Sequence, residues 1–193
     1  DSVTGLVEFE STYFSAFGED PLPYYAECPY APVEAAKKYD ERYPLSLTTG
    51  MRRYTSFHSE HRAIDSLREI DPMPWAQVNP VDAERYGVKD GGWMTIENQF
   101  GKCNMQAQLN VGIKEGVVVT SHGWWFPEEK GDEPNLYGNW KANVCNLLPN
   151  RLCSPLGFGS IQDNMSCIIY PCSSLEDGIV PPAANNERTN CDD

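Results

Sequence analysis

The residues best suited to bind a ligand lie in the segment TTGMRRYTSFHSEHR, residues 48–62. This segment brings the cations Arg52 and Arg53 and the neutral donor His58 close together in a chain whose formal net charge is −13 at pH 7. Gly50 lets a ligand approach the backbone closely, and arginine forms paired hydrogen bonds with phosphate oxygens or heterocycle edges. The segment therefore predicts a binding site for a pyrophosphate or a heterocycle. A solvated basic face is the alternative interpretation.

A second candidate set is SHGWW, residues 121–125. It follows a continuous β-branched run of the kind found in fully buried strands, so a strand delivers these residues to one end of the fold. Adjacent tryptophans pack either on protein or on a flat ligand, and the sequence leaves both interpretations open. Asn143, in the segment NWKANVCN, offers amide donors and acceptors to a heterocycle, with a turn role as the alternative.

Other patterns for catalysis or metal binding are weak. His58 and His61 lack the spacing and the glutamate of a zinc-protease helix, and the GFGS sequence at 157–160 lacks the G-x-S-x-G elbow of serine hydrolases. The seven cysteines contain no C-x-x-C pair. We therefore interpret them as buried thiols, with room for one disulfide, rather than as zinc or iron–sulfur ligands. The acidic run at 127–133 is interpreted as a solvated loop.

Composition bounds the class of protein. The 193 residues are 40% apolar and 11% aromatic, which is typical of one globular core with irregular arms. Fifteen prolines and fifteen glycines predict many turns and few long helices. The chain has no apolar run long enough to span a membrane, and its acidic balance argues against general nucleic-acid binding. We expect no nucleic-acid partner and no direct membrane contact.

The elements that must position these residues are mainly strands. Asn79 predicts a helix N-cap and Gly87 a left-handed C-terminus, so we expect a short helix over 80–86. Apolar spacing predicts a second helix over 60–69. The segments with β-type patterns, which we expect to be strands, are 5–9, 45–49, 75–79, 93–98, 103–111, 117–121 and 166–170.

Strands, short helices and tight turns indicate a small closed barrel rather than a βαβ sheet, so the fold class is mainly β with short helices. We divide the chain into a connecting arm at 1–42, a barrel domain with C-terminal loops at 43–171, and a flexible tail at 172–193. The apolar residues of the arm need a surface to lie on. The start of the chain has neither an initiator Met nor an apolar signal region. We expect it to be part of a longer protein.

The order of five motifs resembles a known family. In chain order, the five motifs are TGLVEFES with DPLPYY, LTTG…FHSEHR, WAQVNPVDAERYGVKDGGWMTIENQFGKCNMQA, GVVVTSHGWW and NVCNLLP. Together they are similar to the molybdopterin-dinucleotide-binding C-terminal domain of the dimethyl sulfoxide reductase superfamily (molybdopterin oxidoreductases). The resemblance covers roughly residues 4–171. It implies a double-psi β-barrel of the aspartate-decarboxylase-like type, as in the formate dehydrogenase C-terminal domain.

The resemblance also implies a cofactor and its contacts. Catalytic subunits of this superfamily, many of them from anaerobic respiration, hold molybdenum or tungsten between two molybdopterin guanine dinucleotides (bis-MGD). The cofactor-binding residues carried over to this sequence are Thr49, Gly50, Met51, Arg52, Arg53, His58, Ser59, Glu60, His122, Gly123, Trp124 and Asn143. The metal ligand and an iron–sulfur cluster are expected in upstream domains. We therefore expect neither a catalytic residue nor a metal ligand in this chain.

The function implied is that of a cofactor-binding domain in an oxidoreductase that acts on a small substrate. Its expected partners are the rest of its own catalytic subunit and an iron–sulfur electron-transfer subunit, and the isolated domain is expected to be inactive. A redox-neutral hydratase or hydroxyl transferase of the same superfamily is one alternative. A non-catalytic acidic protein-binding module that uses Trp124 and Trp125 is another. An upstream twin-arginine signal would distinguish an exported enzyme from a cytoplasmic one.

Overall fold

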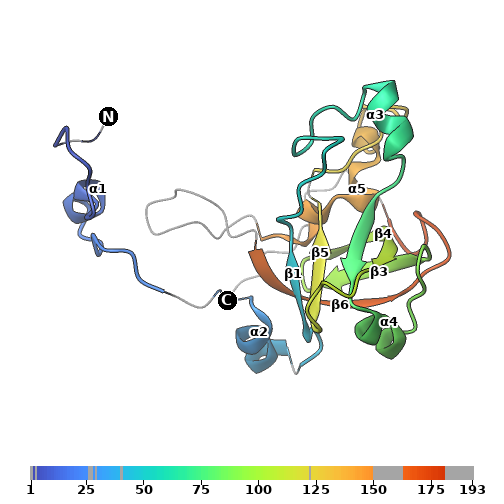
Figure 1. Ribbon diagram of the computed structural model, residues 1–193, viewed down its shortest axis with the longest axis horizontal. Helices are drawn as coiled ribbons and strands as arrows, with labels where there is room; N and C mark the ends of the chain where they lie inside the picture. Colours follow the sequence, from blue (N-terminus) through green and yellow to red (C-terminus); the bar gives the residue numbers. More distant parts are fainter. Residues whose placement is uncertain are drawn as a thin grey trace.

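Six strands close a barrel in the order β1-β5-β2-β4-β3-β6 (Figure 1). The computed structural model describes residues 2, 4–25, 28, 30–39, 41–121, 123–149 and 163–180. The pairs β1/β5 and β2/β4 are parallel, and the other four pairs are antiparallel. The strands are β1 (Leu45–Thr48), β2 (Trp75–Val78), β3 (Trp93–Asn98), β4 (Gly101–Leu109), β5 (Val117–Thr120) and β6 (Asp163–Pro171). The predicted mainly β closed barrel is confirmed.

The barrel interior is filled by alternate side chains of its strands, as the pleat of a β-strand dictates. Leu45 and Leu47 of β1 are buried, while the residues that follow each of them are only half-buried. Each buried aliphatic side chain of this size stabilises the fold by about 2 kcal/mol. The other core members from the strands are Ala76, Val78, Met94, Ile96, Cys103, Met105, Ala107, Val118, Met165, Cys167 and Ile169.

Most predicted strands are confirmed to within three residues, and the strand at Trp93–Asn98 has the predicted bounds. The strand predicted at 5–9 is wrong. Leu6, Val7 and Phe9 are exposed and pair with no strand among the described residues. A lone strand leaves its backbone hydrogen-bonding groups without partners, so β propensity alone does not make this segment a strand.

The short helix α4 (Pro80–Tyr86) forms as predicted. The Asn79 side chain accepts a hydrogen bond from the Val81 N–H at 2.9 Å, and Gly87 ends the helix at φ 72°. The helix predicted over 60–69 is wrong at its start, because α3 spans only Asp65–Ile70. His61 has a φ of 73°, which a right-handed helix excludes.

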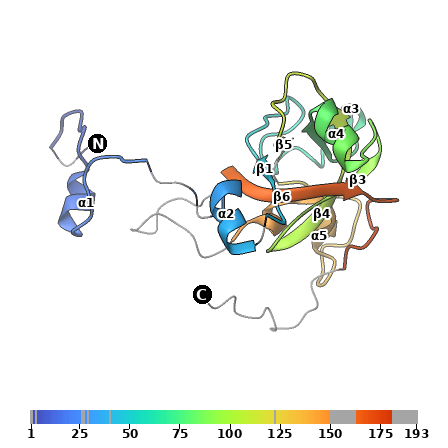
Figure 2. The same ribbon diagram turned by 90° about the horizontal axis from the view of Figure 1, so that it is seen from below.

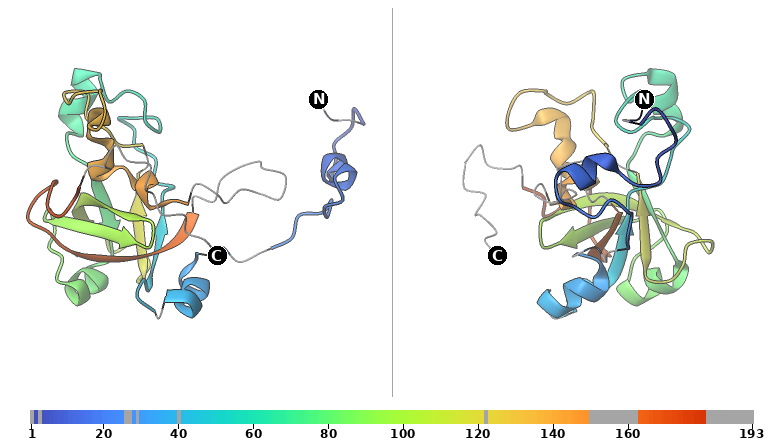
Figure 3. Two further views of the ribbon diagram at one scale, coloured as in Figure 1. Left: turned by 180° about the vertical axis from the view of Figure 1, so that it is seen from behind. Right: turned by 90° about the vertical axis from the view of Figure 1, so that its left-hand side faces the viewer.

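The helices gather at the two ends of the barrel. In Figures 1 and 3, α3 and α5 (Asn139–Ala142) lie at one end, while α4 and α2 (Pro32–Tyr39) lie at the other. Figure 2 shows α2 beside β6. Two 3₁₀ turns, η1 (Leu136–Gly138) and η2 (Val144–Leu147), flank α5. Within the described ranges, none of the helices combines the length and the apolar character that crossing a bilayer requires.

Part of the predicted flexible tail is anchored to the barrel. The buried Asn104 of β4 donates from its amide nitrogen to the carbonyl oxygens of Ser174, Leu175 and Asp177 at 2.9–3.1 Å. These bonds satisfy a polar side chain that the core would otherwise leave unpaired. The tail predicted from residue 172 onward therefore begins with a stretch that is hydrogen-bonded to β4. Residues 181–193 lie outside the described residues, and the other domain bounds stay predictions.

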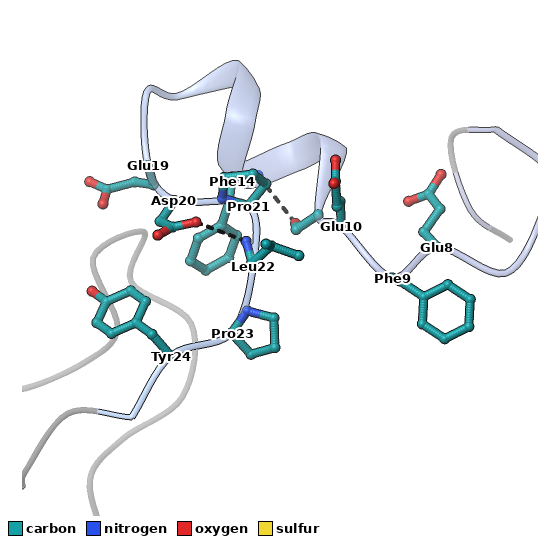
Figure 4. A pocket seen from close by; sticks show the side chains of 11 residues that line it. Glu8, Phe9, Glu10, Phe14, Glu19, Asp20, Pro21, Leu22, Pro23 and Tyr24 are labelled. Carbon is teal, nitrogen blue, oxygen red and sulfur yellow. Dashed lines mark hydrogen bonds between the residues drawn. The ribbon is translucent and has the colours of Figure 1, made fainter.

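The arm that precedes the barrel stands apart from it, with α1 (Thr12–Ala16) at its far end (Figures 1 and 3). The arm has a hollow of its own, of about 610 Å³, which Figure 4 shows from close by. Phe9, Phe14, Leu22 and Tyr24 supply its apolar wall. This hollow lies far along the chain from the candidate binding segments.

Candidate functional site: a cavity at the ends of two parallel strands

The two candidate segments meet where β1 and β5 end. Because β1 and β5 are parallel neighbours, both deliver their following residues to the same edge of the barrel. Gly50 pairs with Ser121 in an isolated bridge, and the Met51 N–H lies 3.4 Å from the Thr120 carbonyl oxygen. The residues after the two strands therefore lie side by side.

A cavity of about 150 Å³ lies at this edge. Five of the predicted site residues line it, and three further residues complete the wall. The lining residues are Gly50, Met51, Arg52, Arg53, Ser56, Phe57, His58 and Ser121. Pockets for whole drug-sized ligands measure about 300–1,000 Å³, so this cavity suits one moiety of a larger molecule.

Arg52 and His58 present the polar groups of the cavity, and Phe57 supports both. The Arg52 guanidinium carbon lies 5.9 Å from the centre of the Phe57 ring, and the His58 ring meets that ring edge-on at 4.4 Å. Both polar side chains are exposed, so a ligand can reach them. An exposed cation beside a backbone with no side chain at Gly50 is suited to a phosphate or to the edge of a heterocycle.

Arg53 is oriented differently from its neighbour. Its side chain is 3% exposed and forms an ion pair with Asp71. Its Nη2 also donates to the Trp75 carbonyl oxygen at 3.2 Å. Burial lowers the pKa of the Arg53 guanidinium, although the Asp71 carboxylate opposes this shift. Arg53 therefore contributes to the cavity wall, while its charge pairs with the Asp71 carboxylate inside the domain.

Trp124 belongs to the core at the base of this loop. It is 2% exposed and packs with Phe126 and Ala142. The guanidinium carbon of Arg62 lies 3.3 Å from the centre of the Trp124 ring, and that of Arg53 lies 4.7 Å from it. Stacking of buried cations on an aromatic face contributes up to about 2 kcal/mol each. Of the two open interpretations, core packing describes the position of Trp124, which does not line the cavity.

Arg62 was not among the predicted site residues. Burial, and then the nearby Arg68 cation, lower its pKa to about 10. Its Nη2 donates to the backbone carbonyl oxygen of Asp71 at 3.2 Å. Nothing in the sequence pattern distinguished Asp71, an acid between an isoleucine and a proline. The partners of a buried carboxylate are set by the tertiary fold.

The remaining predicted residues surround the cavity or lie outside the described residues. Ser59 packs against Gly123, where an added Cβ would come within 2.9 Å of the Ser59 Cβ. Glu60 is exposed and donates from its N–H to the Phe57 carbonyl oxygen, closing the turn. Asn143 accepts a hydrogen bond from the Cys145 N–H at 3.0 Å, which is the turn role.

Two of the twelve predicted residues remain. Thr49 is 2% exposed and directly follows the strand β1, which ends at Thr48. His122 lies outside the described residues. Within the described ranges, no three His, Cys, Asp or Glu side chains come close enough together to hold a metal ion. The arrangement that the structure does assemble is a donor-lined cavity, which suits an anionic or heterocyclic ligand.

A closed β-barrel with such a cavity at parallel strand ends defines a ligand-binding domain. The sequence model of the family described as "Molydopterin dinucleotide binding domain" matches residues 45–159, more than half of the chain. The chain belongs to this family, and every residue that lines the cavity falls within the matched range. The exposed guanidinium, the imidazole and the open backbone at Gly50 fit an anionic dinucleotide.

Relatives by sequence are much longer than this chain. Dopamine dehydroxylase of Eggerthella lenta is 42% identical over 109 residues, which are 56% of this chain and 10% of that protein. Dimethyl sulfoxide reductase DmsA of Escherichia coli is 28% identical over 142 residues, 73% of this chain and 16% of that protein. The chain thus spans a small part of the length of these relatives.

A solved structure resembles most of the chain. Acetylene hydratase from Pelobacter acetylenicus matches with a TM-score of 0.75 and 27% sequence identity, covering 88% of this chain and 24% of that one. With the family match and the relatives named above, this similarity confirms the molybdopterin-dinucleotide-binding domain of the dimethyl sulfoxide reductase superfamily. It also confirms the predicted fold, the double-psi β-barrel.

Proposed function

We propose that this chain is the cofactor-binding domain of a catalytic subunit that holds molybdenum or tungsten in bis-MGD. The observation that carries the proposal is the donor-lined cavity at the ends of β1 and β5, inside the range that matches the family. When bound, the cofactor supplies redox chemistry for a small substrate. The domain itself contributes binding and orientation.

Three features of the cavity define what the chain does for the cofactor. The Arg52 guanidinium balances phosphate charge, and the His58 imidazole offers a hydrogen-bond donor beside it. The absence of a side chain at Gly50 lets the ligand reach the backbone. Phe57 keeps Arg52 and His58 on one side of the cavity, so that they act on the same moiety.

The rest of the catalytic subunit is the first proposed partner. The cavity holds one moiety, and the relatives that contain this domain are several times longer than the chain. Upstream domains would then provide the other walls, the metal ligand and an iron–sulfur cluster. An iron–sulfur electron-transfer subunit is the second proposed partner, and the isolated domain is expected to be inactive.

Redox-neutral chemistry is the second candidate function. It is supported by the structural similarity to acetylene hydratase, whose name describes addition of water rather than electron transfer. A non-catalytic protein-binding module that uses Trp124 and Trp125 is less well supported, because Trp124 is buried and Trp125 is half-buried. Metal and guanine-nucleotide analysis of the complete protein, followed by a redox titration, distinguishes the three.

Arg52→Gln in the complete protein tests the proposed function. We expect the guanine dinucleotide content per protein to fall by about tenfold, because one charge-assisted contact is worth about 1.5 kcal/mol or more. Arg85→Gln is the matched control, since Arg85 is an exposed arginine on α4 at the opposite end of the barrel. Equal dinucleotide content in the two variants would contradict the proposal.

A further inference from the structure

One carboxylate binds the loop that carries the cavity. Asp71 is 8% exposed and stands at the C-terminal end of α3. Its carboxylate forms the ion pair with Arg53 and accepts hydrogen bonds from the Thr55 hydroxyl and the Trp75 indole N–H, both at 2.9 Å. The Arg62 guanidinium lies 3.9 Å away. Four side chains therefore converge on a single acid.

The residues bound to Asp71 are close in sequence to those that line the cavity, and Arg53 belongs to both sets. Going along the loop, the anchored residues are Arg53, Thr55 and Arg62, and all three are buried. The cavity-lining residues stand between and beside them: Arg52, Ser56, Phe57 and His58. The loop therefore has an inner side held by Asp71 and an outer side available to a ligand.

The backbone of this loop is held in an unfavourable conformation. His58 has a φ of 52° and His61 a φ of 73°, in the left-handed region that side chains other than glycine seldom adopt. Such conformations cost about 1–3 kcal/mol and persist where the surrounding contacts determine them. Both histidines lie between the anchored residues Thr55 and Arg62. The Asp71 contacts are thus positioned to maintain the strained turn that presents His58.

Acceptors are scarce in this cluster. Among the described residues, Arg53 Nε, Arg62 Nε and Trp124 Nε1 are buried and have no hydrogen-bond acceptor. Arg53 and Arg62 are both buried cations, and Asp71 is the acid that contacts them. Without its charge, Arg53 would lose its ion-pair partner and Arg62 would keep only the attraction of Glu128, which is strongly unfavourable for buried guanidinium groups.

We propose that Asp71 is a positioning residue of the cofactor site. It holds the inner side of the loop at 53–62, so that Arg52, Phe57 and His58 form the cavity before the ligand arrives. Asp71 does not touch the ligand; it acts through Arg53, Thr55 and Arg62. This inference rests on the proposed function of the cavity and adds to it the group that keeps the cavity open.

Asp71→Asn, made in the complete protein, is the first test. An asparagine presents an NH₂ group to donors that need an acceptor, so the loop should detach. We expect the guanine dinucleotide released per protein to fall by about tenfold, the size of effect that loss of an orienting partner has on a bound ligand. Amides of residues 50–59 should also exchange hydrogen faster than in the wild type.

Asp82→Asn is the matched control. Asp82 is another buried acid, 1% exposed, which accepts from the Gly116 N–H at 2.6 Å and from Arg85 at 3.1 Å. It belongs to α4, at the far end of the barrel from the cavity (Figure 1). The Asp82→Asn substitution should lower the unfolding temperature and leave the dinucleotide content unchanged. Equal dinucleotide loss in both variants would overturn the positioning role.

A second pair of variants applies if Asp71→Asn fails to fold. Thr55→Val keeps the volume of the side chain and removes the hydroxyl that binds Asp71. Thr55→Ser keeps the hydroxyl and removes a buried methyl. A positioning role predicts dinucleotide loss in Thr55→Val and rescue in Thr55→Ser. If Thr55 had a purely structural role, the dinucleotide content of each variant would fall in proportion to the fall in its unfolding temperature. That result would overturn the inference.

Arg52→Gln separates the two claims. If it retains the dinucleotide, the proposed function itself fails. If Arg52→Gln loses the dinucleotide while Asp71→Asn and Thr55→Val retain it, the cavity binds the cofactor and Asp71 does not position it.

Discussion

Arg52 and Arg53 are neighbours in sequence with separate physical roles. Both line the cavity, but the Arg52 side chain is exposed whereas the Arg53 side chain is buried against Asp71. Sequence alone treats them as equivalent cations, since it contains no sign of Asp71 as the partner of Arg53. The structure assigns the exposed role to Arg52 and the buried role to Arg53.

Arg53→Met is predicted to destabilise the fold. The substitution breaks the buried ion pair with Asp71 and the hydrogen bond to the Trp75 carbonyl oxygen, while Arg62 stays 3.9 Å from the carboxylate, so we expect a cost of about 3 kcal/mol. Denaturant unfolding measures this cost. Arg52→Met, whose side chain is exposed, should change the free energy of unfolding by less than about 0.5 kcal/mol. Similar losses in the two variants would contradict the assignment.

Gly123→Ala is predicted to displace the turn beside the cavity. Gly123 has a φ of 76°, and an added Cβ would lie 2.9 Å from both the backbone nitrogen and the Cβ of Ser59. The variant should be destabilised by about 2–3 kcal/mol, from strain and from the clash. Gly116→Ala is the control for strain alone, because its φ is 81° and nothing lies within 4 Å of the added atom. Calorimetry of both variants isolates the clash.

Elements whose signals are local were predictable from the sequence. The helix α4 has Asn79 and Gly87 at its two ends, and the β3–β4 hairpin closes around a two-residue turn between Asn98 and Gly101. Elements that depend on contacts with distant residues were not predictable from the sequence. The helix α3 begins late because the backbone at His61 is left-handed, and the loop before α3 contacts Asp71 through side chains that no sequence rule pairs with it. Prediction therefore succeeded at strand ends and failed in the loop that completes the site.

The contact between β3 and β6 predicts a fall in stability at alkaline pH. The Tyr170 hydroxyl donates to the Glu97 carboxylate across these strands. Burial, and then this hydrogen bond, raise the pKa of Tyr170 from its ordinary value of 10.0 to about 12. Below pH 10 the stabilisation is complete. It is lost as the pH rises from 10 to 12, because the unfolded state releases its proton first.

Tyr170→Phe tests this dependence. The variant should be less stable than the wild type at pH 8, and its stability should fall less steeply between pH 10 and 12. The wild-type slope also contains the buried thiols of Cys103 and Cys167, whose pKa burial raises. Tyr54→Phe is the control, at a residue that is 90% exposed. Parallel stability profiles for wild type and Tyr170→Phe would disprove the assigned hydrogen bond.

At the scale of the whole molecule, charge is unevenly distributed. The chain carries a formal net charge of −13, yet cations gather at the base and the mouth of the cavity. The arm is the opposite extreme: residues 4–25 contain no lysine or arginine. Glu8, Glu10, Glu19 and Asp20 surround its hollow (Figure 4). Domain and arm are therefore suited to different partners, an anionic ligand for the first and a cationic surface for the second.

The last prediction concerns the surface that the arm binds. Its side chains include Leu6, Val7, Phe9 and Tyr25, each at least 74% exposed, and apolar patches of this kind mark interaction sites. Since carboxylates surround the hollow, we expect the arm to dock on an apolar surface with a basic rim, in the remainder of the same catalytic subunit. Amides of residues 4–25 should then exchange hydrogen slowly in the complete protein.

Phe9→Ser should release the arm, and high salt should weaken its docking, because the basic rim is screened within about 10 Å at 0.1 M salt. Val111→Ser is the matched control, since Val111 is as exposed as Phe9, at 86%, but lies in the loop between β4 and β5. Exchange of residues 4–25 at the rate of an unstructured peptide in the wild type would refute docking. If hydrogen exchange at residues 4–25 stays slow both in Phe9→Ser and at high salt, the arm makes its contact through other residues.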